Sequence, residues 1–356
     1  MLNQHRLRQL TGLMAARNWD TLLLYGHTWR KDFFRCLVNI NFSGPHAVAA
    51  LDQSGDLEVI VSDPWDAELI SDSGLHVSNA SSLEQALTRR ATGRVAIAGM
   101  ELMEARFVSA VGERPESATF DVEELRRVKS AEEIACIRKA ADLADRGYRH
   151  FAATVVPGMA EYELVAEVES FLKANGAEDN FMLIASGGVE VTGMKPPTER
   201  RFREGDSVTT ELTPQVNGYW AQICRTLVIG EPTAGQRESF AIFSEAQRAA
   251  EDFLRPGVNI ADVARVQNDV FRKYGFGEYT GPKYTRVRGH GLGLHCDENP
   301  WILEDVHYTV KEGMVLIAHP NTYLPLSGYM VFGDSMVVTA GGCAPLNHTE
   351  RKLFQK

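Results

Sequence analysis

Hydrophobic and polar positions along roughly the first third of the chain alternate in short blocks. Compact apolar runs predict strands, and apolar residues repeating every three to four positions predict helices between them. The strands are expected at 21–25, 47–51, 58–62 and 94–98, and the helices at 3–17 and 82–90. This alternation predicts a small α/β domain.

A charged stretch at 123–129 ends this pattern. Ser130 follows it as a candidate N-cap, and Glu133 stands in the first turn of the expected helix, where the helix dipole favours a negative charge. We therefore place a domain boundary here. Residues 1–122 are assigned to the N-terminal α/β domain and 123–356 to a C-terminal domain.

The C-terminal part has longer helices and a different order of elements. Its apolar periodicity predicts helices first, then strands, then helices and strands again. The helices are expected at 131–154, 161–175, 234–253 and 260–274, and the strand-rich segments at 208–229, 314–319 and 329–339.

Composition narrows the classes of protein to be considered. The net charge of −10 and the pI near 5.5 argue against a partner with a phosphate backbone or an anionic lipid surface. No apolar run approaches the roughly 20 residues that span a bilayer, and no signal-peptide core follows Met1, so a cytoplasmic protein is expected. The five cysteines are scattered without Cys-x-x-Cys spacing, which indicates reduced thiols rather than disulfides or a zinc knuckle.

A set of short phrases runs in a fixed order through the second half of the chain. They are Ala-Ser-Gly at 185–187, Arg-Glu-Gly-Asp at 203–206, Gly-Tyr at 218–219, Arg-Thr at 225–226, Gly-His-Gly-Leu-Gly at 289–293, Glu-Gly-Met at 312–314 and Val-Val-Thr at 337–339. In order and spacing the chain resembles the pita-bread family of methionine aminopeptidase, prolidase, aminopeptidase P and creatinase. The extra N-terminal domain resembles the creatinase and prolidase branch.

This resemblance implies an α+β fold. A small N-terminal α/β domain of the creatinase kind would precede a pita-bread domain, in which helices back a curved antiparallel sheet and the site lies on the concave face. A homodimer is also implied. Within it, the aromatic and basic segment 29–35 could reach the neighbouring subunit's site.

The peptidases of this family hold two divalent metal ions with two Asp, one His and two Glu. Carried over by position, these ligands fall on Glu211, Gln222, His290, His319 and Gly333. Four of the five positions differ, and the formal negative charge of the set drops from four to one. Such a set does not suit two closely spaced cations, so an ordinary dinuclear metallopeptidase is not expected.

Two interpretations of the remaining groups stay open. Glu211, His290 and His319 offer one carboxylate and two imidazoles, which would suit a single divalent metal ion. Alternatively, these side chains bind one another or a substrate directly, as the resemblance to the metal-free creatinase implies. We favour the second interpretation and expect no cofactor.

Proton transfer needs a group that titrates near neutral pH. The histidine that serves as proton shuttle in the family falls on Met194, and the neighbouring Lys195 could replace it if burial lowered its pKa. The family's second active-site histidine falls on Asp297. Asp297 beside His290 and His319 would form an acid/base set.

Further residues are candidate contacts to a small substrate, because Arg binds carboxylates through two hydrogen bonds and polar side chains fix orientation. They are Tyr219, Gln222, Arg286, Arg288, Lys195 and His295. Cys224 and Cys296 could act as nucleophiles, although an isolated Cys is more often a small buried apolar residue. Arg225 matches a framework position of the family.

The leading hypothesis is a metal-independent, creatinase-like hydrolase. It would act on a C–N bond of a small zwitterionic, guanidino or amino-acid-derived substrate, with His290, His319 and Asp297 handling protons and Glu211 binding a cationic group. Two alternatives are a mononuclear metalloenzyme and a non-catalytic protein that uses the scaffold for binding. No nucleic-acid or membrane partner is expected.

Overall fold

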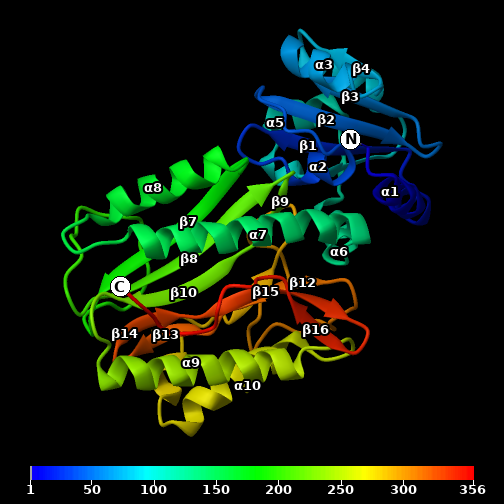
Figure 1. Ribbon diagram of the computed structural model, residues 1–356. Coiled ribbons are helices and arrows are strands. Elements are labelled where there is room, and N and C mark those ends of the chain that lie inside the picture. The colour runs from blue at the N-terminus through cyan, green and yellow to red at the C-terminus, as the bar shows by residue number, and fades with distance from the viewer. Residues whose placement is uncertain (1) are drawn as a thin grey trace. The chain divides into compact units, whose positions relative to one another are not determined.

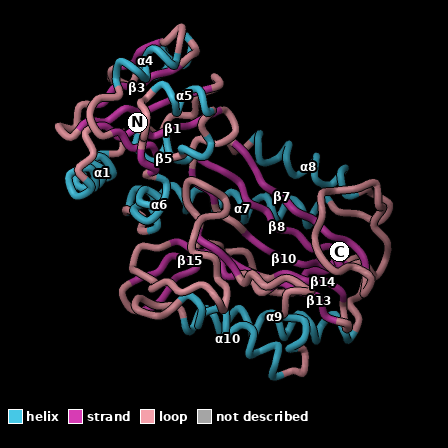
Figure 2. The backbone as a smooth tube through the Cα atoms, turned by 180° about the vertical axis from the view of Figure 1, so that it is seen from behind, coloured by secondary structure: helices cyan, strands magenta, loops and turns pink. Residues whose placement is uncertain are grey.

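The computed structural model describes residues 2–356 and divides into two compact units, 1–126 and 127–356 (Figures 1 and 2). The division falls inside helix α6 (Thr119–Arg127), whereas the sequence placed it after residue 122. No helix among the described residues is long and apolar enough to cross a bilayer.

The first unit is built on a mixed six-stranded sheet. Its strand order is β4 (Val77–Asn79), β3 (Leu57–Val61), β2 (His46–Asp52), β1 (Thr21–His27), β5 (Val95–Ala98) and β6 (Glu116–Ser117). Around the sheet lie α1 (Gln4–Arg17), α2 (Asp32–Leu37), α3 (Pro64–Ser71), α4 (Leu83–Arg90), η1 (Met100–Leu102) and α5 (Ala105–Ala110). The predicted α/β unit is confirmed. The elements missed by periodicity are short, because two turns or three strand residues carry no repeat.

The second unit contains a nine-stranded sheet whose main path is antiparallel. The path runs β11 (Gly289–Gly291), β12 (Val315–Ala318), β15 (Gly333–Thr339), β10 (Ile223–Val228), β8 (Ser207–Val216) and β7 (Asp179–Gly187). At its margins are β9 (Tyr219–Trp220), β16 (Gly342–Pro345) and β17 (Phe354–Gln355), and a separate hairpin joins β13 (Asn321–Leu324) to β14 (Gly328–Val331).

Two pairs of helices cover this sheet, as Figure 1 shows. The helices are α7 (Ala131–Thr154), α8 (Glu161–Ala174), α9 (Ala234–Phe253) and α10 (Ile260–Lys273), and a short turn, η2 (Gly277–Thr280), follows α10. All four long helices were predicted from the sequence. Helix α7 begins with the expected cap, since the Ser130 hydroxyl accepts from the Glu133 amide and the Glu133 carboxylate accepts from the Ser130 amide.

Alternation along the strands separates the two faces of the sheet. Leu212 and Ile223 pack into the core under α7 and α8, and Leu316 and Met336 pack into the core under α9 and α10. Strand neighbours of these residues point to the opposite face, called here the inner face. The inner face is where the candidate site lies.

Candidate functional site

Strand register brings distant residues together on the inner face. Glu211 on β8 lies opposite Cys224 on β10, and Cys224 lies opposite Gly333 on β15. On the far side of β15, Ala318 at the end of β12 lies opposite Gly289 on β11. His290 lies opposite Ile317, so His290 and His319 are diagonal neighbours across these two strands. The ring centroids of His290 and His319 are 5.2 Å apart.

The segment after His290 folds back on itself and returns Asp297 to the imidazole. Gly291 and Glu298 exchange two backbone hydrogen bonds of 2.8 and 2.9 Å, which closes the loop between them. A Cβ at Gly291 would lie 2.7 Å from the Asn299 carbonyl oxygen, so this tight closure requires glycine. As a result His290 Nε2 lies 3.1 Å from Asp297 Oδ1.

A buried ion pair holds the same loop. The Glu298 carboxylate accepts from the amides of Leu294 and His295, at 3.0 and 3.2 Å, and from Lys129 Nζ at 2.9 Å. Both partners of the ion pair are buried. Asp297 therefore stands on a rigid turn, which favours a fixed distance to His290.

The hydrogen bonds of His290 define where its protons are. Nδ1 lies 2.9 Å from the Gly291 carbonyl, which can only accept, so Nδ1 carries a hydrogen. Nε2 lies 3.1 Å from Asp297 Oδ1, so the carboxylate is placed to stabilise the imidazolium that forms when Nε2 takes up a proton. Burial lowers the pKa of His290, and Asp297 opposes this shift. The pair is suited to accept and release one proton.

His319 is the most unusual buried group of the site. Its side chain is almost fully buried, yet neither ring nitrogen has a hydrogen-bond partner within the described part of the chain. Burial, and then the nearby His290, holds the pKa of His319 well below its ordinary value. A neutral imidazole offers one donor and one acceptor. Leaving both unmet costs free energy, which indicates that a ligand or water completes the site.

Glu211 is a buried carboxyl group beside Gln222. Burial, and then the charge of Asp297, raises the pKa of Glu211 to about 8, while a hydrogen bond from Gln222 opposes the shift. The carboxyl group is therefore largely protonated at neutral pH and can donate a proton. Its neighbour Cys224 is also buried, which raises the pKa of the thiol, so the geometry does not favour the nucleophile considered from the sequence.

These residues do not fit the metal centre of the peptidases. Gln222 is neutral, and no group of three or more His, Cys, Asp or Glu side chains within residues 2–356 is arranged to hold a metal ion. Gly333 also leaves no room for a ligand. A Cβ there would lie 2.6 Å from His319 Cβ and closer still to the Ala318 carbonyl oxygen.

Within the described residues, the side chains of the two expected arginines make their hydrogen bonds away from the inner-face groups. Arg286 forms an exposed ion pair with Asp305 at 2.5 Å. Arg288 is fully buried, and its guanidinium donates to Asn268 Oδ1 at 2.6 Å and to the Asn321 carbonyl at 2.9 Å. Both guanidinium groups thus bind other residues in this structure, and their role as carboxylate contacts stays a prediction.

Three other expected substrate contacts are used elsewhere. The hydroxyl of Tyr219 donates to Glu133 Oε1 at 3.0 Å, which ties β9 to α7. The His295 ring nitrogen Nδ1 accepts from the Asp297 amide at 3.2 Å and so stabilises the turn. Lys195 bridges the outer edge of β7, where its amide donates to the Ile184 carbonyl at 3.2 Å.

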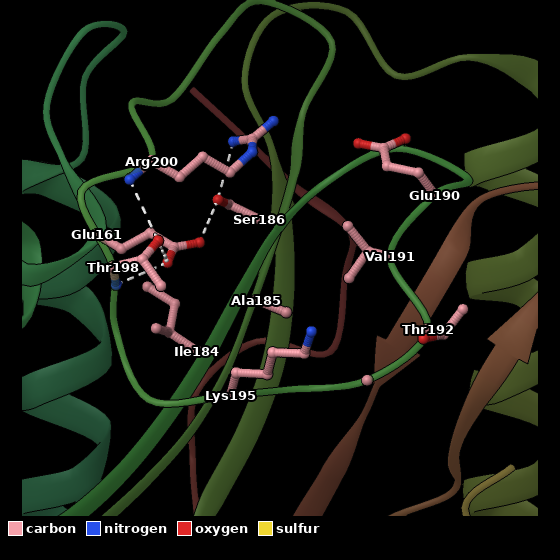
Figure 3. Close-up of a pocket in the computed structure, with 11 residues that line it drawn as sticks. Glu161, Ile184, Ala185, Ser186, Glu190, Val191, Thr192, Lys195, Thr198 and Arg200 are labelled. Atoms are coloured by element: carbon pink, nitrogen blue, oxygen red, sulfur yellow. Dashed lines mark hydrogen bonds between the residues drawn. The ribbon is translucent and has the colours of Figure 1, made fainter.

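Lys195 lines a separate pocket of about 260 Å³ (Figure 3). The lining includes Glu161, Ser186 and Arg200 but none of Glu211, His290 or His319. The Glu161 carboxylate is already satisfied by Ser186 and Thr198. Lys195 is therefore not placed to replace the missing shuttle at the histidine pair.

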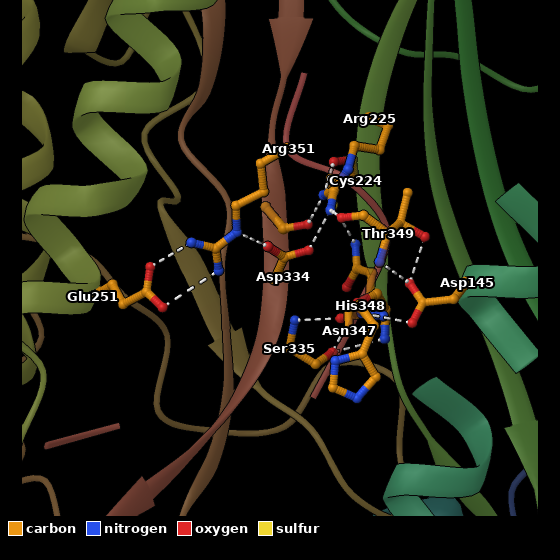
Figure 4. A network of polar contacts seen from close by, with 12 residues as sticks. Asp145, Cys224, Arg225, Glu251, Asp334, Ser335, Asn347, His348, Thr349 and Arg351 are labelled. Atoms are coloured by element: carbon orange, nitrogen blue, oxygen red, sulfur yellow. Dashed lines mark hydrogen bonds and ion pairs between the residues drawn. The ribbon is translucent and has the colours of Figure 1, made fainter. Parts of the chain in front are cut away.

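A polar network braces the site strands from behind (Figure 4). Arg225 is fully buried, donates to the carbonyls of Cys224 and Gly333 at 2.9 and 2.8 Å, and pairs with Asp334 at 2.6 Å. Arg351 pairs with the other oxygen of Asp334 at 2.8 Å. This gives Arg225 the framework role expected from the sequence.

Tyr329 on β14 was missed by the sequence reasoning. It is buried, and its strand contacts β8 and β10. Burial, and then the charge of Glu211, raises the pKa of its phenol. Tyr329 belongs to no ordered phrase, and only the folding of the hairpin onto β8 and β10 brings it to the site. A tyrosine among the apolar residues of a strand carries no sequence pattern that would predict a functional role.

The curved antiparallel sheet, backing helices and N-terminal unit define a pita-bread protein. The chain belongs to metallopeptidase family M24, whose model matches residues 135–340. The family and the fold predicted from the ordered phrases are confirmed.

Curated relatives resemble this chain over its larger part. It is 33% identical to an Xaa-Pro dipeptidase of Pyrococcus furiosus over 235 residues, which is 65% of this chain and 66% of that protein. It is 31% identical to a probable dipeptidase of Mycobacterium tuberculosis over 247 residues, 69% of this chain and 65% of that protein. The chain thus matches just under two thirds of these relatives' own length.

Solved structures match the fold over almost the whole chain. A prolidase from Pyrococcus furiosus superposes with a TM-score of 0.82 at 25% identity, covering 96% of this chain and 99% of that one. An X-Pro aminopeptidase from Thermotoga maritima gives 0.86 at 22% identity, covering 98% and 99%. The second likeness concerns the fold alone.

Proposed function

We propose that this protein hydrolyses a C–N bond of a small substrate without a dinuclear metal centre. The observation that carries the proposal is that the inner face holds two groups able to transfer protons. His290 is a buried imidazole whose Nε2 faces the Asp297 carboxylate, and Glu211 is a buried carboxyl group with a pKa raised to about 8. Groups whose pKa values are pushed apart in this way are suited to act as base and acid in one reaction.

In the proposed reaction, His290 removes a proton from water while the water oxygen bonds to the substrate carbon. The C–N bond then breaks, and the leaving nitrogen takes the proton of Glu211. The proton held by His290 and Asp297 returns to Glu211 through product or solvent, since the Asp297 side chain is 38% exposed. Glu211 thereby acts as an acid rather than as the fixed anion expected from the sequence.

The ring nitrogens of His319, which have no hydrogen-bond partner within the described residues, favour a ligand-binding site over a scaffold that binds no ligand. A buried imidazole with two unmet nitrogens lowers stability unless a ligand completes it, so a non-catalytic protein without a ligand would gain from its loss. The relatives favour a small amino-acid-derived substrate, because several are named as dipeptidases. We also propose that two copies of the chain form a homodimer. A native mass measurement tests this.

The test is turnover of a small panel in the presence and absence of a chelator. The panel contains N-acyl amino acids, guanidino and amidino compounds, and Xaa-Pro dipeptides, and metal content is measured on the same sample. The proposal expects chelator-resistant turnover that Glu211→Gln reduces roughly 100-fold or more. Turnover that appears only with added metal would contradict it and favour the mononuclear alternative. Absence of turnover across the panel would contradict the hydrolase itself.

A further inference from the structure

Ser335 stands where strand β15 changes its neighbour. β15 pairs with β10 at residues 333–334 and with β16 at residues 336–339, while β12 occupies its other edge. Between these two stretches, the Ser335 amide donates to Asn347 Oδ1 at 2.8 Å, and the Ser335 carbonyl accepts from the Leu346 amide at 2.8 Å. Both backbone groups of Ser335 are therefore engaged by the C-terminal segment.

The hydroxyl of Ser335 makes the contact to the β10 side instead. Ser335 Oγ accepts from the Gln222 amide at 2.9 Å and donates to the Gln222 carbonyl at 2.8 Å. In an antiparallel ladder, two opposite residues exchange two such bonds through their backbones. Here one hydroxyl serves as acceptor and donor at once, which no apolar side chain can do. Both residues are buried, so losing these bonds would leave the Gln222 peptide groups unmet.

The C-terminal segment that holds Ser335 is itself anchored on helix α7. Asp145 accepts from the His348 amide at 2.7 Å through one oxygen, and from the amide and hydroxyl of Thr349 at 3.1 and 2.6 Å through the other. Figure 4 draws these contacts together with Ser335 and Asn347. A continuous path of hydrogen bonds thus leads from α7 through residues 346–349 to the backbone of Gln222.

The side chain of Gln222 lies on the inner face next to Glu211. Ile223 packs into the core under α7 and α8, so its neighbours Gln222 and Cys224 point to the opposite face. Glu211 lies directly opposite Cys224, which makes Gln222 its diagonal neighbour across the two strands. Gln222 Nε2 is 3.5 Å from Cys224 Sγ, so the amide extends toward this pair. From there it reaches the Glu211 carboxyl, to which it also makes a hydrogen bond.

This contact determines which oxygen of Glu211 carries the proton. A neutral carboxyl group has one oxygen that accepts hydrogen bonds and one hydroxyl that donates. The amide nitrogen of Gln222 can only donate, so it binds the accepting oxygen and leaves the hydroxyl of Glu211 to the substrate. The position of the Gln222 backbone therefore controls the direction of the acid.

We propose that Ser335 is a positioning residue, whose hydroxyl fixes Gln222 so that the Gln222 amide orients the Glu211 carboxyl toward the substrate. Residues 346–349 support the site through the same path. The inference rests on the proposed hydrolysis, in which Glu211 protonates the leaving nitrogen.

Two substitutions at Ser335 separate the hydroxyl from packing. Ser335→Ala should lower kcat roughly 10-fold to 100-fold with KM changed less than about threefold, because Glu211 acts in the transition state. Ser335→Thr keeps a hydroxyl and should stay within about fivefold of the wild-type kcat. Ser207→Ala is the matched control, since Ser207 is a buried serine of the same sheet whose hydroxyl accepts from Gln236 at 3.0 Å. Its kcat should stay within about twofold of the wild type.

Hydrogen exchange of the Gln222 amide, followed by mass spectrometry, tests the contact without turnover. Ser335→Ala should speed this exchange about tenfold or more, and Ser335→Thr and Ser207→Ala should leave it near the wild-type rate. Unchanged exchange in Ser335→Ala would overturn the contact. Faster exchange with unchanged kcat would overturn its role in the reaction, and a loss of kcat that Ser335→Thr does not restore would assign the effect to packing.

The anchor on α7 is tested by Asp145→Asn. It removes acceptors of the C-terminal segment, and we expect kcat to fall about threefold to tenfold with little change in KM. Asp142→Asn, an exposed position on the same helix, is the control and should leave kcat unchanged. Equal kcat values for the two variants would overturn the role of residues 346–349. A wild type without turnover would instead remove the proposed function, while hydrogen exchange still decides whether Ser335 holds Gln222.

Discussion

His290 and Asp297 form the central pair of the inner face, with Nε2 3.1 Å from Oδ1 and with Nδ1 directed at the Gly291 carbonyl. The carbonyl fixes the tautomer, and the carboxylate stabilises the imidazolium. This arrangement lets one proton move between buried imidazole and half-exposed carboxylate. It also sets the sign of the pH dependence.

Asp297→Asn should lower kcat roughly 100-fold or more, because the imidazolium that His290 forms on taking up a proton loses its carboxylate partner. The substitution removes the largest influence that raises the pKa of His290, so this pKa would fall further and the acidic limb of the kcat/KM profile should move to lower pH. A pH series of initial rates checks this. Asp305→Asn, which removes an exposed carboxylate paired with Arg286, is the control. An unshifted acidic limb would exclude His290 as the base.

Glu211 should make stability depend on pH. Its pKa is raised to about 8 in the folded protein, so its contribution is fully present below the unfolded pKa near 4.3 and is lost as pH rises toward about 8. Glu211→Gln should remove this loss, which we put on the order of 5 kcal/mol at most. Urea unfolding at several pH values measures it. Parallel curves for the two proteins would show that Glu211 is ionised when folded.

His319→Leu should separate stability from activity. It removes two unmet buried nitrogens, so the free energy of unfolding should stay within about 1 kcal/mol of the wild type or rise. The rate should fall roughly 100-fold, because the variant loses a donor and an acceptor in the site. Chemical denaturation and initial-rate kinetics, measured on the same preparation, check both expectations. A stability loss above about 2 kcal/mol would mean that His319 already has partners.

Gly333→Ala should destabilise the protein by about 2 kcal/mol. The added Cβ meets His319 Cβ at 2.6 Å and the Ala318 carbonyl oxygen, both on an adjacent central strand. Gly341→Ala is the matched control, since a Cβ there meets nothing within 4 Å. Equal midpoints in urea would show that β12 and β15 can separate, and that a carboxylate ligand could be restored.

Asp334→Asn should cost about 3–5 kcal/mol, because it leaves the fully buried Arg225 without its charged partner. The exposed pair of Asp262 and Arg265 offers a comparison, and Asp262→Asn should cost less than about 1 kcal/mol. Chemical denaturation of both variants checks the difference. Similar losses at the two positions would argue against a bracing role for the Arg225 network.

The local sequence pattern was enough to predict many of the secondary-structure elements of this protein. The long helices, such as 234–253, and the ordered phrases around His290 follow from periodicity and spacing, because these are properties of neighbouring residues. Positional comparison also located Glu211, Gln222, His319 and Gly333. The comparison did not determine the chemical role of each of these residues.

Tertiary structure alone decided the directions and the environments of the side chains. Arg288 and Lys195 are polar residues close to site phrases, yet packing turns one into a buried network and the other to a sheet edge. Tyr329 comes to β8 and β10 only because a distant hairpin folds over these strands. Burial sets the protonation of Glu211 and His319, and burial depends on every layer of the fold at once. The sequence therefore determined the scaffold and the identity of the groups, while the chemistry of the site depends on how the fold excludes water from them.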